Sequence, residues 1–207
     1  ANVGDAVTVS VANSIASATN VTANIAFGIT DSLSNLANNG SAESELTTAA
    51  TDDTNVNITI SDNTTTMAAA DLSAVTGATT GTVTLTNAQT ITGTGAQLTA
   101  ALITDAVTLG AASDATVSDA ISAADAAAIA GVGSITAAYT LGISDTFANL
   151  LNGAENAINA NVTTAAGDDA DIKIAITDNS KTLAASKLSL ITAGTTGTVT
   201  LNNSHTI

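Results

Sequence analysis

The stretch TISDNTTTMAAADLSAVTGATTGTVTL occupies residues 59–85, and it returns as AITDNSKTLAASKLSLITAGTTGTVTL at residues 175–201. Aligning residues 57–91 with residues 173–207 at a constant offset of 116 gives 20 identities in 35 positions. Self-similarity at a fixed period is typical of repeat architectures. The sequence therefore contains an internal repeat with two copies.

A second matched block lies upstream of the first. FGITDSLSNLANNG at residues 27–40 matches LGISDTFANLLNGA at residues 141–154, at an offset of 114. The change of offset means that two residues are inserted between the blocks in the second copy. We accordingly divide the chain into repeat copy one, residues 1–91, and repeat copy two, residues 92–207.

The alternation within each copy indicates the local structure. VNITISD at residues 56–62 places Val56, Ile58 and Ile60 on one face, which predicts a strand with one buried side. The second copy has isoleucine at all three matching positions, Ile172, Ile174 and Ile176, while the outward residues change, as expected if only the inner face is constrained. The Ala-rich tract at 62–78 then predicts a short helix.

Strand, turn and short helix recur along the whole chain. The pattern predicts strand centres near residues 8, 29, 58, 84, 108, 141, 174 and 200. Strands joined by short helical crossovers are parallel, and units this small must stack to bury a core. We predict an α/β fold, an elongated repeat solenoid of short parallel strands and short Ala-rich helices. The alternative is two tandem α/β repeat domains, and a disordered tract is disfavoured because the alternation recurs.

Composition excludes several classes of function. The chain has three aromatic residues, one histidine, no cysteine and no proline, so aromatic-lined ligand pockets and thiolate metal sites are not expected. The net charge of −15 argues against nucleic acid, whose phosphates need cations. No stretch approaches the roughly 20 apolar residues of a membrane span, so membrane insertion is not expected. We predict that the protein is not an enzyme.

The phrases GITDSLSNLANNG, GISDTFANLLNG and ITDNSKTLAASKLSLITAGTTGTVTL resemble a family of repeats. Repeats of the Asp-Thr-Ala-Ala-Asn-Leu type occur in very long, acidic, Ala/Thr-rich surface proteins of bacteria, particularly marine cyanobacteria. One such giant protein is associated with swimming without flagella. The resemblance implies an extracellular or cell-surface array, and it supplies no catalytic residues.

The candidate metal ligands are Asp31, Asp62, Asp145 and Asp178, each of which ends a strand and begins a turn. They could bind Ca²⁺ together with neighbouring acids, namely Asp52, Asp53, Asp168 and Asp169. The competing interpretation is that their carboxylates cap helices or form Asx-turns by accepting backbone N–H bonds. No EF-hand spacing is present to favour calcium. No cofactor other than this possible Ca²⁺ is expected.

Three further features have simple structural interpretations. Asn35 and Asn149 are expected to bond backbone groups between successive coils. His205 has Gln89 at the matching position of the first copy, so it is expected to be a surface residue rather than a catalytic base. The Thr-x-Thr strings suit β-strands, and an ice-binding surface is a remote alternative.

The leading hypothesis is a structural repeat segment of a large secreted or cell-surface bacterial protein, acting as a fibre, stalk, coat or motility-associated scaffold. A calcium-dependent adhesin module is the alternative, motivated by acids at turns. Ile207 matches Ile91, after which the first copy continues, so the sequence reads as an excerpt from a longer array. The expected partners are neighbouring repeats of the same protein, or other copies in a fibre or sheet.

Overall fold

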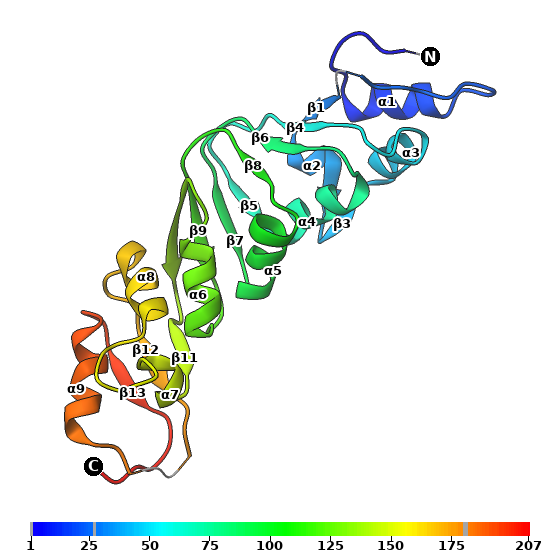
Figure 1. Cartoon of the computed structure of the whole chain (residues 1–207). Helices are drawn as coiled ribbons and strands as arrows, with labels where there is room; N and C mark the ends of the chain where they lie inside the picture. The colour runs from blue at the N-terminus through cyan, green and yellow to red at the C-terminus, as the bar shows by residue number, and fades with distance from the viewer. Residues whose placement is uncertain (1, 27, 180–181) are drawn as a thin grey trace. The chain divides into compact units, whose positions relative to one another are not determined.

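The computed structural model describes residues 2–26, 28–179 and 182–207 (Figure 1). The chain divides into two compact units. Unit 1 comprises Ala1–Thr92 and Ala100–Ser113, and unit 2 comprises Gly93–Thr99 and Asp114–Ile207. The boundary predicted after residue 91 falls beside the first division point, whereas 100–113 groups with the N-terminal unit.

Unit 1 is organised around a parallel sheet whose strands follow their order in the sequence. The strands are β1 (Ile29–Asp31), β4 (Ile58–Ile60), β6 (Val83–Leu85) and β8 (Thr108–Leu109). Ile29 is in register with Ile58, and Ile58 with Val83. These residues are at most 4% exposed. The predicted alternation is therefore realised as a buried apolar column that runs across the strands.

Short helices connect these strands. Unit 1 contains α1 (Val9–Ala16), α2 (Leu33–Leu36), α3 (Ser44–Asp52), α4 (Ala69–Ala78) and the π-helical turn η1 (Ala100–Thr104). It also contains the hairpin β2 (Ala37–Asn38) and β3 (Ser41–Ala42), and the parallel pair β5 (Thr66–Ala68) and β7 (Thr90–Gly93). α1 packs against α3, and α4 packs against η1.

The strand predicted near residue 8 is a helix, so that prediction was wrong. Thr8 is the N-cap of α1, and its Oγ1 accepts a hydrogen bond from Val11 N at 3.4 Å. The N–H of Val9 is bound by the carboxylate of Asp31 at 3.0 Å. These two acceptors satisfy the start of the helix and outweigh the local β-branched alternation. Val7, just before them, keeps a parallel bridge to Ile29.

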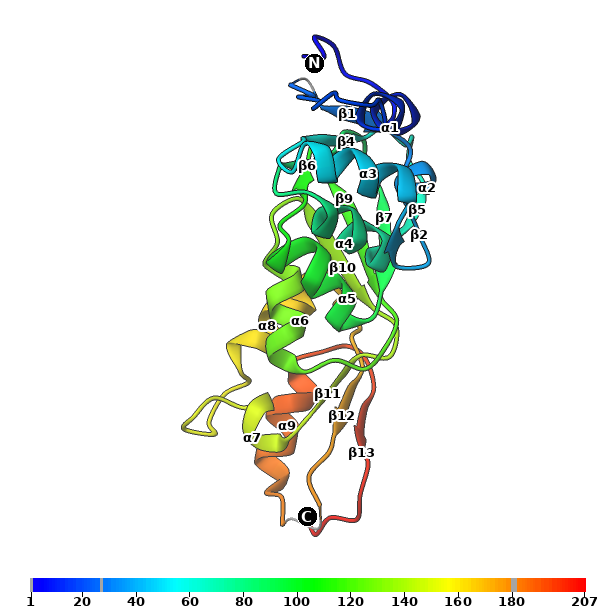
Figure 2. The ribbon, with the colours of Figure 1, turned by 90° about the vertical axis from the view of Figure 1, so that its right-hand side faces the viewer.

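Unit 2 repeats the same plan. Its helices are α5 (Gly95–Thr99), α6 (Ala123–Ala130), α7 (Phe147–Leu150), α8 (Ala160–Asp168) and α9 (Ala185–Ala193). Its strands are β9 (Ser113–Val117), β10 (Ile135–Tyr139), β11 (Ile143–Asp145), β12 (Ile174–Ile176) and β13 (Val199–Leu201). Figure 2 shows β11, β12 and β13 side by side, and all three are parallel.

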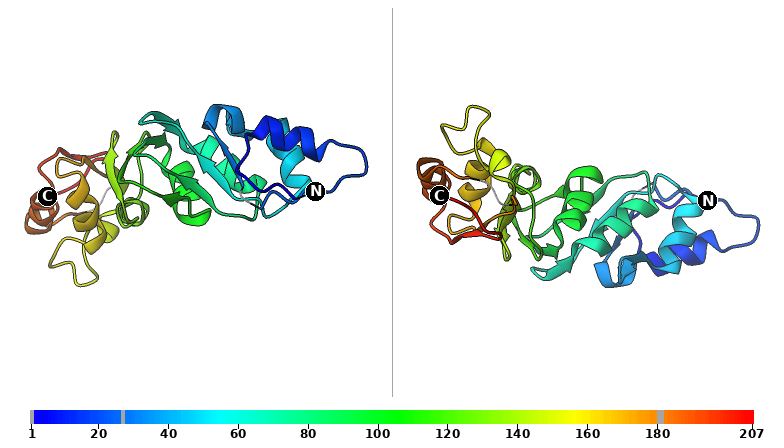
Figure 3. Two further views of the ribbon diagram at one scale, coloured as in Figure 1. Left: turned by 90° about the horizontal axis from the view of Figure 1, so that it is seen from above. Right: turned by 90° about the horizontal axis from the view of Figure 1, so that it is seen from below.

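The two-residue insertion lies between α7 and α8. In unit 1 the matching place is the β2–β3 hairpin, which is closed by the pair Ala37–Ala42. In unit 2 an antiparallel bridge between Leu151 and Ile158 closes a loop that is two residues longer. This loop projects from the unit in both views of Figure 3. The offset thus changes from 114 to 116 without disturbing the parallel strands on either side.

The fold is therefore a mixed α/β structure with several parallel sheets and short helices, as the α/β prediction states. Two further details differ from expectation. The tract after Ile60 was predicted as turn and helix alone, but Thr66–Ala68 forms β5 before α4 begins. The centre predicted near residue 141 falls between β10 and β11.

Candidate functional site

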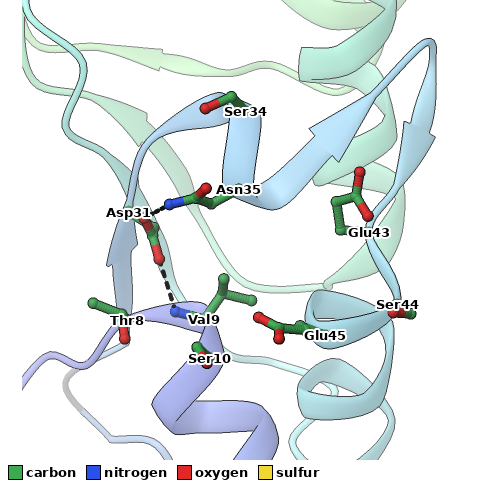
Figure 4. A pocket seen from close by; sticks show the side chains of 9 residues that line it. All are labelled: Thr8, Val9, Ser10, Asp31, Ser34, Asn35, Glu43, Ser44 and Glu45. Atoms are coloured by element: carbon green, nitrogen blue, oxygen red, sulfur yellow. Dashed lines mark hydrogen bonds between the residues drawn. The ribbon is translucent and has the colours of Figure 1, made fainter.

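Asp31 and Asp145 occupy equivalent places at the ends of β1 and β11. The Oδ2 atom of Asp31 accepts a hydrogen bond from Val9 N, the first residue of α1, at 3.0 Å, and its Oδ1 accepts from Asn35 Nδ2 (Figure 4). The same Oδ1 also accepts from Ser32 N. Asp145 repeats all three bonds, to the residues at the matching positions. Ala123 N lies at 3.0 Å, Thr146 N at 2.8 Å and Asn149 Nδ2 at 2.7 Å.

Asp62 and Asp178 make the corresponding contact one strand later. Asp62 Oδ2 accepts from Leu33 N, the first residue of α2, at 2.7 Å. Asp178 Oδ2 accepts from Phe147 N, the first residue of α7. A carboxylate at a helix N-terminus satisfies an orphan N–H and complements the helix dipole. Each of the four candidates thus caps a helix that precedes it in the sequence.

The neighbouring acids have the same kind of partner. Asp53 Oδ2 accepts from Ile25 N at 2.6 Å, and Asp52 accepts from Ala23 N. In unit 2, Asp168 and Asp169 bind Ala137 N at 2.9 Å and Tyr139 N at 2.8 Å. We call these acids and the four above the bridging aspartates: Asp31, Asp52, Asp53, Asp62, Asp145, Asp168, Asp169 and Asp178. Each joins its own segment to a backbone N–H 22 to 31 residues earlier.

Local electrostatics in unit 2 follow from this arrangement. Burial, with Asp168 and Asp169 nearby, raises the pKa of the Tyr139 hydroxyl far above its ordinary 10.0. That hydroxyl donates to Ala126 O at 2.6 Å. Burial raises the pKa of the Asp169 carboxyl above 3.8. The hydrogen bond from the Tyr139 N–H lowers this pKa in part, and the nearby Asp171 carboxylate raises it further. Tyr139 is therefore a neutral hydrogen-bond donor rather than a phenolate at physiological pH.

A pocket opens beside Asp31. It has a volume of about 540 Å³, and its lining includes Asn35, Glu43 and Glu45 (Figure 4). A smaller pocket of about 190 Å³ lies at the equivalent place beside Asp145. Its rim residues are Asn159 and Asn161, which match the two glutamates at the offset of 116. The aspartate and its asparagine partner are thus common to both pockets, whereas the acidic rim is not.

The carboxylates do not gather into a recognisable ion site. Among the residues that the structure describes, no group of three or more His, Cys, Asp or Glu side chains is placed to hold a metal ion. The bridging aspartates instead direct oxygens at backbone donors. A Ca²⁺ ion needs six to eight oxygens around one point. Calcium binding by Asp31, Asp62, Asp145 or Asp178 therefore stays a prediction.

Asn35 and Asn149 do not bond backbone groups between segments, as the sequence had led us to expect. Each donates its Nδ2 to the aspartate four residues earlier, at 2.7 Å. This bond orients the carboxylate so that its other oxygen faces the preceding helix. The asparagines are therefore positioning residues for Asp31 and Asp145, and only the repeated Asp-x-x-x-Asn spacing could have suggested it.

His205 and Gln89 show how one position differs between the copies. Gln89 is 3% exposed, its Oε1 accepts from Thr65 N, and its Nε2 donates to Asp62 O. His205 is half-buried, and both of its ring nitrogens are buried without a hydrogen-bond partner in the described part of the chain. It therefore does not pair with a nucleophile there.

The threonines form a rank in unit 1. Thr30, Thr59, Thr84 and Thr108 lie in register across the four strands of the main sheet. The equivalent positions in unit 2 are Ser144, Ala175 and Thr200, so the rank is not repeated there. An ice-binding surface stays a remote alternative, confined to unit 1.

No helix in the described residues is long and apolar enough to cross a membrane. No protein-family model, curated protein or solved structure was found to match the chain. The assignment of a function therefore depends on the geometry given above.

Proposed function

We propose that this chain is a non-catalytic structural repeat segment of a large secreted or cell-surface bacterial protein, and that it forms part of a fibre, stalk, coat or motility-associated scaffold. Its architecture in this proposal is an α/β solenoid. One coil of the solenoid is a strand together with the helix that follows it. The observation that carries the proposal is the set of bridging aspartates, which occurs at matching positions in both copies.

The order of the strands supports stacking. β1, β4, β6 and β8 are neighbours in sequence order and parallel, as are β11, β12 and β13. Each coil therefore lies beside the next coil in the chain. This arrangement is the one in which every unit contacts its sequence neighbours, and stability is then a sum over coils and their interfaces.

The use of the acids supports a structural rather than a catalytic role. Catalytic carboxylates are directed at a substrate, commonly from a cleft where their pKa is shifted. Here eight carboxylates accept backbone N–H groups of an earlier coil. Bonds from an N–H to an ionised acceptor are stronger than neutral ones, so each is a firm link between coils. The high acid content thus serves assembly of the stack, and the cell-surface setting is inferred from the family resemblance.

Small-angle X-ray scattering tests the architecture. A compact protein of this length has a radius of gyration of about 17 Å, whereas a solenoid must exceed it. A value at the compact expectation would contradict the solenoid. The surface role is tested by brief protease treatment of intact cells that produce the protein. Its repeats should be cleaved while a cytoplasmic control protein survives, and protection of the repeats would contradict that role.

A calcium-dependent adhesin module is the second candidate. The pocket whose lining includes Asp31, Glu43 and Glu45 is where this candidate is tested most directly, although these three carboxylates are not grouped as a metal site. Because the matching pocket has Asn159 and Asn161 on its rim, this acidic pocket occurs in the first copy alone. Calorimetric titration of the protein and of a Glu43→Gln, Glu45→Gln variant would test it. Equal heats in the two would exclude this pocket.

A further inference from the structure

The chain contains two Asn-Gly pairs, and each lies in the connection that follows a short helix. Asn39-Gly40 forms the turn of the β2–β3 hairpin, and Asn152-Gly153 lies in the longer loop after α7. Asparagine followed by glycine is the pair in which the side-chain amide is lost most readily, because glycine has no Cβ to shield its backbone nitrogen. Each pair is therefore a chemically labile position.

Deamidation of Asn39 begins with attack by the backbone nitrogen of Gly40 on the side-chain carbon Cγ. The N–Cγ bond forms, the Cγ–Nδ2 bond breaks, and ammonia leaves with the proton of the Gly40 N–H. Water then opens the resulting succinimide ring at either carbonyl, which gives aspartate or isoaspartate. The reaction thus needs a Gly40 nitrogen that is free to move toward Cγ and to give up its proton.

In the structure the Gly40 nitrogen is held. Its N–H donates to Asp71 Oδ1 at 2.6 Å, and Asp71 lies in the first turn of α4. A hydrogen bond to an ionised acceptor is stronger than one to a neutral acceptor. The carboxylate also opposes loss of the N–H proton, because the amide anion would lie beside a negative charge. Asp71 therefore hinders both requirements of the reaction.

The hairpin turn restrains the pair as well, but burial does not. Asn39 has φ +52° and Gly40 has φ +73°, as in a type I′ turn, and Asn38 pairs with Ser41 across its base. Asn39 and Gly40 are both exposed, so water reaches them. Protection of this pair thus depends on the turn and on the bond to Asp71.

The second Asn-Gly pair is held in a different way. Asn152 Oδ1 accepts from Asn156 N at 3.0 Å and from Ala157 N at 3.3 Å. Its Nδ2 donates to Asn156 Oδ1 at 2.8 Å. Here the side-chain amide is fixed rather than the glycine nitrogen, and turning Cγ toward the nitrogen of Gly153 would break these bonds.

One helix position contacts the labile connection in both copies. At the offset of 116, Asp71 matches Lys187 on α9, and Lys187 forms an ion pair with Glu155 in the second loop. The charge at this position is reversed between the copies. Its target is nevertheless the connection that carries the Asn-Gly pair in each case. The contact is therefore part of the repeat, whereas the bond to a glycine nitrogen occurs in the first copy.

We propose that Asn39-Gly40 is a latent deamidation site, and that Asp71 keeps it unreacted by holding the Gly40 nitrogen. This inference goes beyond the structural role proposed above and does not depend on it. Deamidation would place a second carboxylate beside Asp71, which like charges disfavour. An isoaspartate would also add a methylene to the main chain of a two-residue turn, so the product would no longer fit the hairpin.

Peptide mapping by mass spectrometry, during incubation of the whole chain at mildly alkaline pH, measures the reaction at each asparagine. Asp71→Ala should raise the rate at Asn39 roughly ten-fold or more, since it removes a bond to an ionised acceptor. Asp71→Asn keeps an oxygen acceptor without the charge and should give an intermediate rate. The rate at Asn152 should not change, because its restraints lie in the other unit.

Asp105→Ala is the matched control. Asp105 accepts hydrogen bonds from Ser73 Oγ at 2.7 Å and Thr76 Oγ1 at 2.9 Å, both on α4. Its loss loosens the same helix but leaves the bond to Gly40 in place, so the rate at Asn39 should stay near the wild-type value. An equal rise in Asp105→Ala and Asp71→Ala would show that the stability of α4 alone matters, and it would overturn the role of Asp71.

The wild type gives a test that needs no variant, which decides the matter if Asp71→Ala does not fold. In a denaturant that unfolds the hairpin and α4, Asn39 should deamidate roughly ten-fold or more faster than in the native chain. Equal rates in the native and unfolded states would overturn the proposal. An unchanged rate at Asn39 in a folded Asp71→Ala variant would overturn it too.

Discussion

Replacing Asp145 with asparagine tests whether the bridging aspartates hold successive coils together. Asp145 is 9% exposed and accepts three N–H bonds, from Ala123, Thr146 and Asn149. The amide in Asp145→Asn keeps one oxygen for the two local donors. Its NH₂ group then faces the N–H of Ala123, so donor meets donor. The link to α6 is lost while the side chain keeps its shape.

The size of the effect follows from the geometry. A hydrogen bond to an ionised acceptor contributes about 1.5–3 kcal/mol, and a buried donor left without a partner costs about 1–3 kcal/mol. Ala123 is 1% exposed, so water cannot replace the lost acceptor without a rearrangement. Because the two contributions overlap, we expect Asp145→Asn to lower the free energy of unfolding by about 2–4 kcal/mol. Asp114→Asn, at an exposed acid, should change it by less than about 0.5 kcal/mol.

Urea unfolding followed by far-ultraviolet circular dichroism is the suitable assay, because the chain has one tyrosine and no tryptophan. Hydrogen exchange at the Ala123 amide locates the change. Both should be measured in EGTA and in millimolar calcium. Equal stability of the two asparagine variants would refute the bridging role. A loss that appears only with calcium would instead show that Asp145 acts through a bound ion.

Three further predictions concern the turn, the calcium hypothesis and pH. Gly142→Ala should destabilise the protein by about 2 kcal/mol or more, because Gly142 has φ +78° and an added Cβ would meet the carbonyl of Lys173. Gly153→Ala, with open space around the added Cβ, is the control. Equal urea midpoints for the two variants would contradict the predicted strain at Gly142. The calcium alternative predicts a higher thermal midpoint in millimolar calcium than in EGTA, and an unchanged midpoint would exclude it. Burial raises the pKa of the Asp169 carboxyl above 3.8 in the folded chain, so the folded state binds the carboxyl proton more tightly than the unfolded state does. The contribution of Asp169 to the free energy of unfolding is therefore present below pH 3.8 and is lost as pH rises through the raised pKa. Asp169→Asn should therefore gain stability relative to wild type as pH rises in a series of urea titrations, and a constant or opposite difference would contradict the assignment.

The sequence predicts the strands of the main sheets well, because their signal is local. Val56, Ile58 and Ile60 alternate with polar residues, and all three are buried as expected. Residues 5–12 alternate in a similar way, yet α1 begins at Val9. The acceptor that favours this helix is Asp31, 22 residues away, so no local window contains it.

The same limit applies to the candidate site. The turn positions of Asp31, Asp62, Asp145 and Asp178 are visible from the sequence, but their partners are not. Each partner lies in an earlier segment, at a distance along the chain set by the length of the intervening helix and turns. Local reasoning offers only a cap on the residue's own helix or a metal ligand. The internal repeat is the signal that could have found the pairs, since it shows which spacing is kept in both copies.

The hairpin of unit 1 and the loop that replaces it in unit 2 point to a use in protein engineering. Both are closed at the base, by Ala37 with Ala42 and by Leu151 with Ile158, and the chain between these anchors differs in length. Loop-closure entropy grows slowly with length, so a longer guest peptide would cost little more than the present insertion. Because the anchors isolate it from the parallel ladders, this position suits the insertion of an antigen or affinity tag in either copy, and the proposed array would display such inserts at regular intervals.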